Sequence, residues 1–406
     1  MPVGRTVFAQ LMDHLPLRTF RACIDRYRGD HNVRAFSCLD QFLTLAFAQL
    51  TARESLRDIE TVLGAHRAKL YHMGFRCGPV KRSTLADANE HRDWRIFHDF
   101  AHELIAEVRA LYVDTPLGPQ VELAALVDTT VYALDATTIR LCLTLFPWAT
   151  FRPRLQRGAI KLHTLLDLRG NIPTVVHLTP GTVQEASLLG AFPWEPGAFY
   201  LIDRGYLAFA PLRTLGEAGA CFVTRAKQNF RWERLESRPV PGAVKGGRTR
   251  QRSGVTSDTL ITCAGWATHR KYPGPLRLVR YYDLEHDRYL RFLTNQTTLP
   301  ALTIAALYQR RWQIELFFRW IKQHLRIRAF YGTTENAVCT QLWIAIAVYV
   351  LVAAVHRRYA LPYSLYTTLQ ILSVTLTEQV DVHHLLTNAT ADAPPDEGAN
   401  QLSFFE

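Results

Sequence analysis

Hydrophobic and polar positions divide the chain into a helical first part and a mixed second part. Up to about residue 115, apolar residues recur at helical spacing, as in 39–63 and 93–112. From about residue 120, short runs rich in Val, Ile, Leu and Thr predict strands. These strands are expected at 131–143, 160–168, 172–178, 199–202 and 221–225, with helices at 182–192 and 207–219. The pattern therefore predicts an α/β fold with a mixed sheet core, preceded by a helical domain.

A different texture interrupts this alternation at residues 226–300. Gly and Arg are frequent in 241–254, and residues 276–282 and 289–294 alternate as antiparallel strands do. We therefore expect a β-rich insertion in the sheet core. An apolar helix is predicted at 337–357, and the tail from Asn388 is rich in Pro, Ala and acids, which predicts disorder. Expected domain boundaries are 1–118, 119–360 and 361–406.

The segment after the insertion, taken as one helix over 308–322, separates into two faces. One face carries a lone acid among cations and a phenol within an arc of about 60°, namely Tyr308, Arg311, Glu315 and Lys322. The opposite face is apolar and consists of Ile314, Phe317, Ile321 and Leu325. Residues 308–328 hold six Lys and Arg against the single acid Glu315, whereas a solvated helix usually mixes signs. The first face therefore has the composition of a phosphate-binding site.

The overall charge points in the same direction. The chain has 47 Lys and Arg against 36 Asp and Glu, a net charge of +11. This excess favours an anionic partner, most commonly nucleic acid, although a basic enzyme without a polyanionic partner is equally compatible with it. Seven cysteines without a close pair indicate a reducing compartment. No leader is apparent, and the longest apolar run, 342–355, is short for a membrane span and predicts a buried helix.

Three acids could carry chemistry, and each also has an ordinary explanation. Asp135 lies within an apolar strand, where the alternative is a solvent-facing side chain. Asp203 ends the strand 199–202, where it could cap the next turn. Glu315 could simply pair with an arginine one helical turn away. Taken together, two strands and one helix supply the carboxylates needed to hold two divalent cations that cut a phosphodiester.

A second basic segment lies between Arg225 and Arg252, with nine Lys and Arg and two acids. It includes Lys227 and Arg231, and Trp232 and Trp266 lie in or near it. Arginines interleaved with aromatic residues suit contacts with a nucleic-acid backbone and stacking with bases. A flexible basic loop with core tryptophans explains the same pattern equally well.

The motifs resemble those of a known family. The pattern Tyr308-x2-Arg311-x3-Glu315-x6-Lys322, flanked by Trp312 and the pair 317–318, resembles the signature of the insertion-sequence-four family of bacterial DDE transposases. Two further segments resemble its other acid motifs, namely Leu134-Asp135-Ala136-Thr137-Thr138, with Ala136 where Ser is usual, and Asp203-Arg204-Gly205-Tyr206. The resemblance spans about residues 20–370.

This resemblance implies an RNase H-like core in which Asp135, Asp203 and Glu315 bind two Mg²⁺ or Mn²⁺ ions. It implies cut-and-paste transposition, with DNA cleavage at the element ends followed by strand transfer by the freed 3′-OH. The partners would be double-stranded DNA of the terminal inverted repeats and the target, bound by a dimer in the bacterial cytoplasm at the nucleoid. Residues 1–118 would bind DNA. Residues expected to contact DNA are Tyr308, Arg311, Lys322, Arg319, Trp312, Lys227 and Arg231, and Trp232 or Trp266 would stack a flipped base.

Two other functions remain open from the sequence. A transposase-derived protein could bind DNA without cleaving it, although such a descendant would be free to lose the three acids. A stand-alone nuclease with the same fold would cut DNA but would not join the freed end to a target. Strand transfer separates a transposase from a nuclease, which gives cut products only, and inverted repeats flanking the reading frame would favour the transposase.

Overall fold

The computed structural model describes residues 4–117, 126, 129–142, 144–152, 157–241, 254–323 and 330–388. The chain forms two compact units. Unit 1 comprises Met1–Val113, Ile139–Ile160 and Phe317–Asn400, and unit 2 comprises Asp114–Thr138, Lys161–Leu316 and Gln401–Glu406. The predicted disordered tail lies outside the described residues, apart from its first residue, Asn388.

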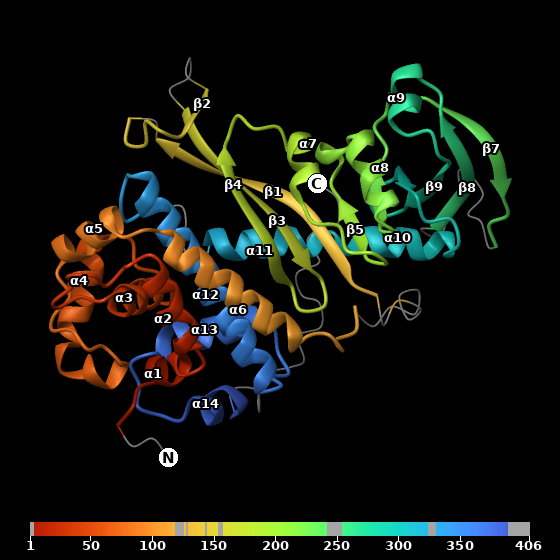
Figure 1. Ribbon diagram of the computed structural model, residues 1–406. Coiled ribbons are helices and arrows are strands. Elements are labelled where there is room, and N and C mark those ends of the chain that lie inside the picture. The colour runs from red at the N-terminus through yellow and green to blue at the C-terminus, as the bar shows by residue number, and fades with distance from the viewer. Residues whose placement is uncertain are drawn as a thin grey trace. The chain divides into compact units, whose positions relative to one another are not determined.

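Unit 1 is helical, as the sequence predicts for the first part of the chain. Its helices are α1 (Val7–Met12), α2 (Leu17–Arg26), α3 (Cys38–Leu50), α4 (Leu56–Ala65), α5 (Arg82–His91), α6 (Arg95–Ala110), α12 (Glu335–Arg358), α13 (Leu365–Thr375) and α14 (Val382–Asn388). The apolar helix α12 packs against α3, α5, α6 and α13 (Figure 1). Although α12 is long and apolar enough to cross a membrane, its most hydrophobic stretch is wholly buried, which confirms the predicted buried helix.

Unit 2 contains most of the sheet, and Figure 1 shows the helices beside it. The strands of the sheet are β1 (Val131–Cys142), β2 (Thr150–Arg152), β3 (Arg157–Asp167), β4 (Ile172–Pro180), β5 (Phe199–Ile202), β6 (Cys221–Arg225), β7 (Trp232–Arg238), β8 (Gly254–Cys263), β9 (Leu276–Asp283) and β10 (Arg288–Thr294). The remaining helices are α7 (Glu185–Leu188), α8 (Phe209–Glu217), α9 (Trp266–Lys271), α10 (Ala301–Arg310) and α11 (Trp312–Gln323).

The strand order defines the core. The sheet runs β2-β3-β1-β5-β6-β10-β9-β8-β7, and β4 pairs with β3. Strand β5 is parallel to both β1 and β6, whereas β10, β9, β8 and β7 follow one another in antiparallel pairs. The segment β4-β3-β1-β5-β6 has the strand order of an RNase H-like sheet, and the antiparallel strands beyond it form the β-rich insertion. The predicted fold class is therefore confirmed.

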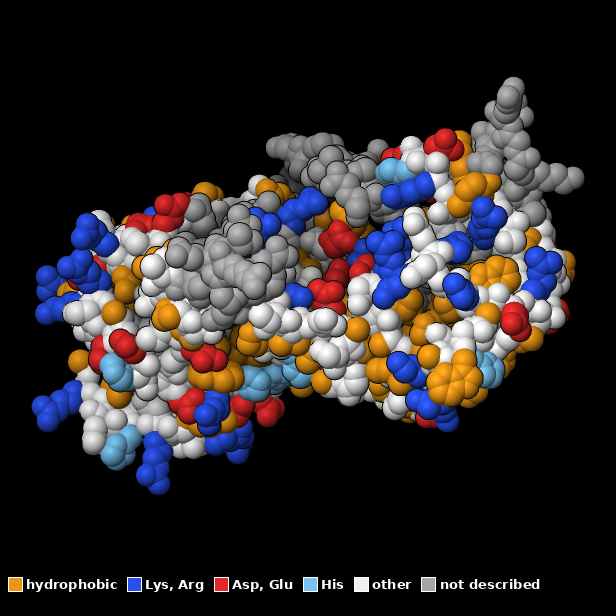
Figure 2. Space-filling model, turned by 90° about the horizontal axis from the view of Figure 1, so that it is seen from above, with side chains coloured by type: hydrophobic (Ala, Val, Ile, Leu, Met, Phe, Trp, Pro, Cys, Tyr) orange, Lys and Arg blue, Asp and Glu red, His pale blue; other side chains and the backbone are white. Residues whose placement is uncertain are grey.

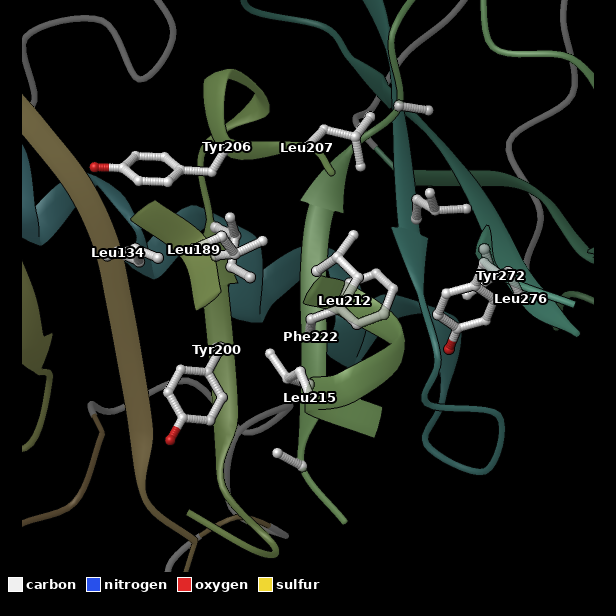
Figure 3. Packing of buried hydrophobic residues seen from close by; sticks show 14 of the residues in the cluster. Leu134, Leu189, Tyr200, Tyr206, Leu207, Leu212, Leu215, Phe222, Tyr272 and Leu276 are labelled. Atoms are coloured by element: carbon white, nitrogen blue, oxygen red, sulfur yellow. The ribbon is translucent and has the colours of Figure 1, made fainter. Parts of the chain in front are cut away.

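One face of the sheet in unit 2 is sealed by a hydrophobic cluster. The side chains of Leu212 and Leu215 on α8 pack with Phe222 of β6 and Tyr200 of β5, and all four are fully buried (Figure 3). Burying a leucine or phenylalanine contributes roughly 1.5–3 kcal/mol. This packing holds β5 and β6 beside β1. It thereby also positions Asp203, which directly follows β5.

Two predicted helices differ from the structure. The expected helix over 182–192 is reduced to α7, which is followed by a short 3₁₀ turn. The expected continuous helix over 308–322 is divided into α10 and α11 at Arg311. Around this junction, hydrogen bonds join residues three apart, from the Arg311 N–H to the Tyr308 carbonyl and from the Ile314 N–H to the Arg311 carbonyl. This tighter turn changes the helical phase, so residues before and after Arg311 do not share one straight face.

Candidate active site

Parallel pairing of β1 with β5 positions the first two acids. In the register of the two strands, Leu134 lies opposite Ile202, so the next residues, Asp135 and Asp203, occupy adjacent positions in neighbouring strands. The Asp203 N–H donates to the Leu134 carbonyl at 3.3 Å, which continues the strand pairing by one residue. Asp203 therefore lies just past the carboxyl end of a parallel strand, where binding sites of α/β sheets gather.

The side chain of Arg311 brings the third acid to the same place. Its Nη1 donates to Asp135 Oδ2 at 2.8 Å and lies 3.9 Å from Asp203 Oδ1. Its Nη2 donates to Glu315 Oε1 at 2.6 Å, one helical turn along the chain. The structure thus gathers Asp135, Asp203 and Glu315 around one guanidinium, and all four residues belong to unit 2.

Burial makes this cluster unusual electrostatically. The side chains of Arg311, Asp135, Glu315 and Asp203 are 14%, 19%, 30% and 37% exposed. Burial raises the pKa of Asp135 to about 7, although the charge of Arg311 acts to lower it. Burial also opposes the charge of Arg311, but Tyr308 and the acids hold the pKa of Arg311 above its usual range. The cluster therefore favours a cation at its centre.

The ordinary roles considered for the acids also occur. Asp203 Oδ2 accepts a hydrogen bond from the Gly205 N–H at 2.8 Å and so caps a short 3₁₀ turn. Asp135 Oδ1 accepts from the N–H of Ala136 at 2.7 Å, and Glu315 pairs with Arg311 as a surface helix acid would. These contacts are compatible with a shared site for the three acids. Each contact uses one carboxylate oxygen and leaves the side chain close to Arg311.

A fourth carboxylate near the site was not predicted from the sequence. A Cβ added to Gly205 would lie 2.5 Å from Glu185 Oε2 and 3.3 Å from Asp203 Oδ2. The Glu185 side chain therefore reaches the turn that follows Asp203, and Lys161 Nζ donates to its other oxygen at 3.2 Å. The signal in the sequence was Lys161, a cation between the apolar strand residues Ile160 and Leu162.

A buried hydrogen-bond chain supports the same turn. Tyr206 follows Asp203 by three residues, and its hydroxyl lies 2.7 Å from His163 Nδ1. The other ring nitrogen of His163 lies 3.0 Å from Thr179 Oγ1, and burial lowers the pKa of His163 to about 4. His163 is thus a neutral packed histidine that joins β3, β4 and the turn after Asp203.

Tyr308 lies in a different place from the one the helical pattern suggested. Its side chain is 3% exposed, and its ring packs against Phe292 of β10. The Arg311 guanidinium lies over the same ring, 5.7 Å from its centre. Burial raises the pKa of Tyr308 to about 12, and its hydroxyl has no hydrogen-bond partner within the described part of the chain. This position follows from the packing of α10 against β8, β9 and β10.

The other expected DNA contacts are spread over both units. Lys227 and Arg231 are exposed between β6 and β7 of unit 2, while Trp312 is partly buried at the start of α11. Arg319 and Lys322 are partly buried farther along α11, in unit 1. Figure 2 shows acidic side chains, in red, bordered by Lys and Arg side chains, in blue.

The two tryptophans differ in exposure. Trp266 on α9 is 76% exposed, and Arg270 lies 4.9 Å from the centre of its indole ring. Trp232 on β7 is only partly exposed and packs against the core cluster of unit 2. The ring of Trp266 is thus the more accessible of the two.

The donor set of the site fits a hard divalent cation. Three carboxylates from β1, the end of β5 and α11 surround a position of positive charge, which the guanidinium of Arg311 occupies. Carboxylate oxygens are the protein ligands that Mg²⁺ and Mn²⁺ prefer, and Mg²⁺ completes its shell with water or substrate phosphate. The site therefore matches such a cation in its negative charge and in the type of its ligand atoms.

Comparison with protein families agrees with this geometry. Residues 127–351 match the family described as the transposase DDE domain, and residues 3–76 match a domain of unknown function (DUF4372). The first match covers more than half of the chain and includes Asp135, Asp203 and Glu315. The chain therefore belongs to the transposase DDE domain family.

Curated relatives point the same way. The protein y4zB of Sinorhizobium fredii, named as a transposase, is 36% identical over 59% of this chain and 65% of its own length. A protein of Geobacillus stearothermophilus, named as a transposase for insertion sequence element IS5377, is 31% identical over 54% of each chain. This chain thus spans less than two thirds of the length of these two relatives.

A third relative is consistent with the finer resemblance to the insertion-sequence-four family. This protein of Synechocystis, named as a transposase for insertion sequence element IS4SA, is 23% identical over 70% of this chain and 75% of its own length. Among solved structures, a piggyBac transposase synaptic complex with hairpin DNA has a TM-score of 0.44 and 14% identity. It covers 97% of this chain and 82% of that chain, but a similarity this low supports no argument.

Proposed function

We propose that this protein is a cut-and-paste transposase, which cleaves DNA at the ends of an insertion sequence and joins the freed 3′-OH to target DNA. The observation that carries the proposal is the convergence of Asp135, Asp203 and Glu315 on Arg311. Acids separated by 68 and 112 residues along the chain have no structural need to share one arginine (203 − 135 and 315 − 203). A site that transfers phosphoryl groups with divalent cations does need them together.

The three acids would hold two Mg²⁺ or Mn²⁺ ions. When bound, such ions supply activation of the attacking hydroxyl and stabilisation of the leaving oxygen. Asp203 is already oriented by the Gly205 N–H, and Asp135 by the Ala136 N–H, so each keeps a second oxygen for a ligand. Glu185 and Lys161 would support the turn beside Asp203 and would not contact the reacting phosphate.

Arg311 has two possible partners in this proposal. Its guanidinium donates to Asp135 and Glu315, so it has to release these oxygens before they can ligate divalent cations. Once released, the guanidinium is available for a phosphate of the DNA, with which it can form two parallel hydrogen bonds. The site would thus exchange an internal cation for metal and DNA.

The DNA would extend beyond this centre. We infer contacts from Lys322, Arg319, Trp312, Lys227 and Arg231, with Tyr308 supporting Arg311 from beneath and reaching DNA only if the junction opens. Residues 1–118 would bind DNA, 119–360 would catalyse, and 361–406 would form the C-terminal part. The DNA partners would be the terminal inverted repeats and the target, held by a dimer in the bacterial cytoplasm at the nucleoid.

The decisive experiment is a cleavage and joining assay on DNA that carries the sequences flanking this reading frame. Wild-type protein with Mg²⁺ should release the labelled ends and join them to a plasmid, whereas Glu315→Gln should do neither. Glu217→Gln is the matched control, because Glu217 is an exposed α8 acid paired with Arg213. Cut ends without joining would indicate a nuclease, and binding without cutting would indicate a DNA-binding descendant; either result would overturn the proposal.

A further inference from the structure

One face of the sheet formed by the insertion strands is apolar at one end and basic at the other. Helix α10 contacts β8, β9 and β10. Its Tyr308 packs against Phe292, which lies opposite Val279 in the strand register, so α10 covers the face that carries these two residues. The other face carries Leu276 and Leu278, which belong to the hydrophobic cluster, at the end where α9 contacts β8. Two residues beyond Leu278 on this same face stands Arg280, which is exposed.

Strand pairing gathers arginines at this uncovered end. Arg280 of β9 lies directly opposite Arg291 of β10, and Arg234 of β7 pairs with Ile261 of β8 on the same face. These side chains line a hollow of about 780 Å³. On this face its chemically distinctive lining residues are Trp232, Arg234, Arg280, Tyr289 and Arg291, whereas Arg238, which lies opposite Asp258 in the register, belongs to the other face. We call this surface the arginine face.

The positive charge of the arginine face is not balanced within it. Like charges directly opposite each other in a sheet are destabilising, and Arg280 and Arg291 form such a pair. The one acid among the described lining residues, Asp258, accepts two hydrogen bonds from Arg277, at 2.8 Å and 2.7 Å. Within the described part of the chain, Arg234, Arg280 and Arg291 form no ion pair with an acid.

The contacts that these arginines do make hold them in place without neutralising them. Arg280 lies over the ring of Tyr289, 4.2 Å from its centre, and Arg291 Nη2 donates to the Lys227 carbonyl at 2.8 Å. The guanidinium groups are thus oriented, and each retains further N–H donors for an anion.

We propose that the arginine face binds a DNA strand through its phosphates, which extends the proposed function to a second contact surface. The arginines occupy β10, β9 and β7, and three strand spacings of about 4.8 Å span roughly 14 Å. In a DNA duplex each strand carries one phosphate per about 3.4 Å of helix axis, so this span corresponds to about four phosphates of axial rise. Tyr289, which is exposed, offers a flat surface for a sugar or base beside them.

The test compares two variants of equal charge change. Arg280→Gln with Arg291→Gln removes the opposed pair, while Arg213→Gln with Lys271→Gln removes two exposed cations of unit 2 outside the hollow. Binding is measured by fluorescence anisotropy with a labelled 30-nucleotide strand and a labelled 30-base-pair duplex, in EDTA so that no metal contributes. Thermal unfolding verifies that both variants fold.

We expect the first variant to bind the preferred probe about 30-fold more weakly at 0.15 M salt, with a salt slope lower by about two. Equal binding of DNA by the two variants would overturn the proposal. The outcome is separable from that of the cleavage assay. Wild-type protein that cuts DNA while the first variant binds normally refutes the arginine face alone, and DNA binding through this face without cutting refutes the transposase alone.

Discussion

The carboxylate site and the arginine face both lie in unit 2, and both concentrate charges of one sign. In the carboxylate site, Arg311 sits among the three acids and balances much of their charge. In the hollow of the arginine face, the one acid among the described lining residues, Asp258, is already paired with Arg277. The first cluster can therefore stand without a ligand, whereas the second remains cationic until an anion binds.

The two sites differ in what a ligand has to displace. A metal ion at the carboxylates has to replace an existing cation, so its affinity reflects a competition. A phosphate on the arginine face replaces only water and relieves repulsion. The following predictions test this difference, from the largest expected effect to the smallest.

Removing one carboxylate should abolish chemistry. Asp135→Asn should lower the rate of end cleavage by about 10³-fold, because a missing ligand removes several kcal/mol of metal assistance. Single-turnover cleavage in Mg²⁺ measures the effect, with Glu217→Gln as control. An Asp135→Asn protein that cuts at a tenth of the wild-type rate or faster would exclude this residue as a metal ligand.

Arg277, which pairs with Asp258, should stabilise the fold, whereas Arg280 and Arg291, which face each other, should not. Asp258→Ala should lower the free energy of unfolding by about 3–5 kcal/mol, because it leaves Arg277, 3% exposed, without its carboxylate. Urea unfolding measures the loss. A cost below about 1 kcal/mol would mean that the pair behaves like a surface ion pair and does not organise the insertion.

Arg311 should compete with metal. In the absence of DNA, Arg311→Gln should bind Mn²⁺ roughly 10–100-fold more tightly, since charge-assisted hydrogen bonds of about 1.5–3 kcal/mol no longer hold the acids. Electron paramagnetic resonance of free Mn²⁺ provides the measurement. Weaker binding by the variant would show instead that Arg311 positions the carboxylates for metal.

Metal binding should also depend on pH near neutrality. Burial raises the pKa of Asp135 to about 7, and only the ionised carboxylate ligates metal. Mn²⁺ affinity should therefore fall by about tenfold per pH unit well below 7.

The same shift in the pKa of Asp135 lets the folded state hold a proton that the unfolded state releases near pH 4. Stability from this group is thus present at low pH and lost as pH rises through about 7.

Asp135→Asn provides the control for the pH effect. The variant should show a flat dependence of stability on pH between about 5 and 8, apart from the contributions of other groups. A wild-type Mn²⁺ affinity that stays constant from pH 7.5 to pH 5.5 would contradict a raised pKa for Asp135.

The smallest expected effect concerns the arginine face. Arg280→Gln should raise the free energy of unfolding by about 0.2–1 kcal/mol at low salt, because it removes the like charge opposite Arg291. The gain should shrink at high salt and should accompany weaker DNA binding. Destabilisation by this substitution would mean that the contact of Arg280 with Tyr289 outweighs the repulsion.

Local pattern was sufficient to predict much of the fold. Short, largely apolar runs predicted β5 and β6 with their observed boundaries, and a longer apolar run predicted α12 as a buried helix. The break at Arg311 was not predictable in this way, because neither Pro nor Gly marks it. It arises where Tyr308 packs on the sheet while Arg311 turns toward the acids.

By itself, the sequence determined which residues had the chemistry for a site: an acid within an apolar strand, an acid after a strand, and an acid on a basic helix. Those assignments follow from local burial cost and helical period, which act over a few residues. Only the tertiary structure decided that Asp135, Asp203 and Glu315 share Arg311, that Glu185 lies beside them, and that Arg280 faces Arg291. Strand register and helix junctions set these contacts, because they depend on packing between segments far apart in the chain.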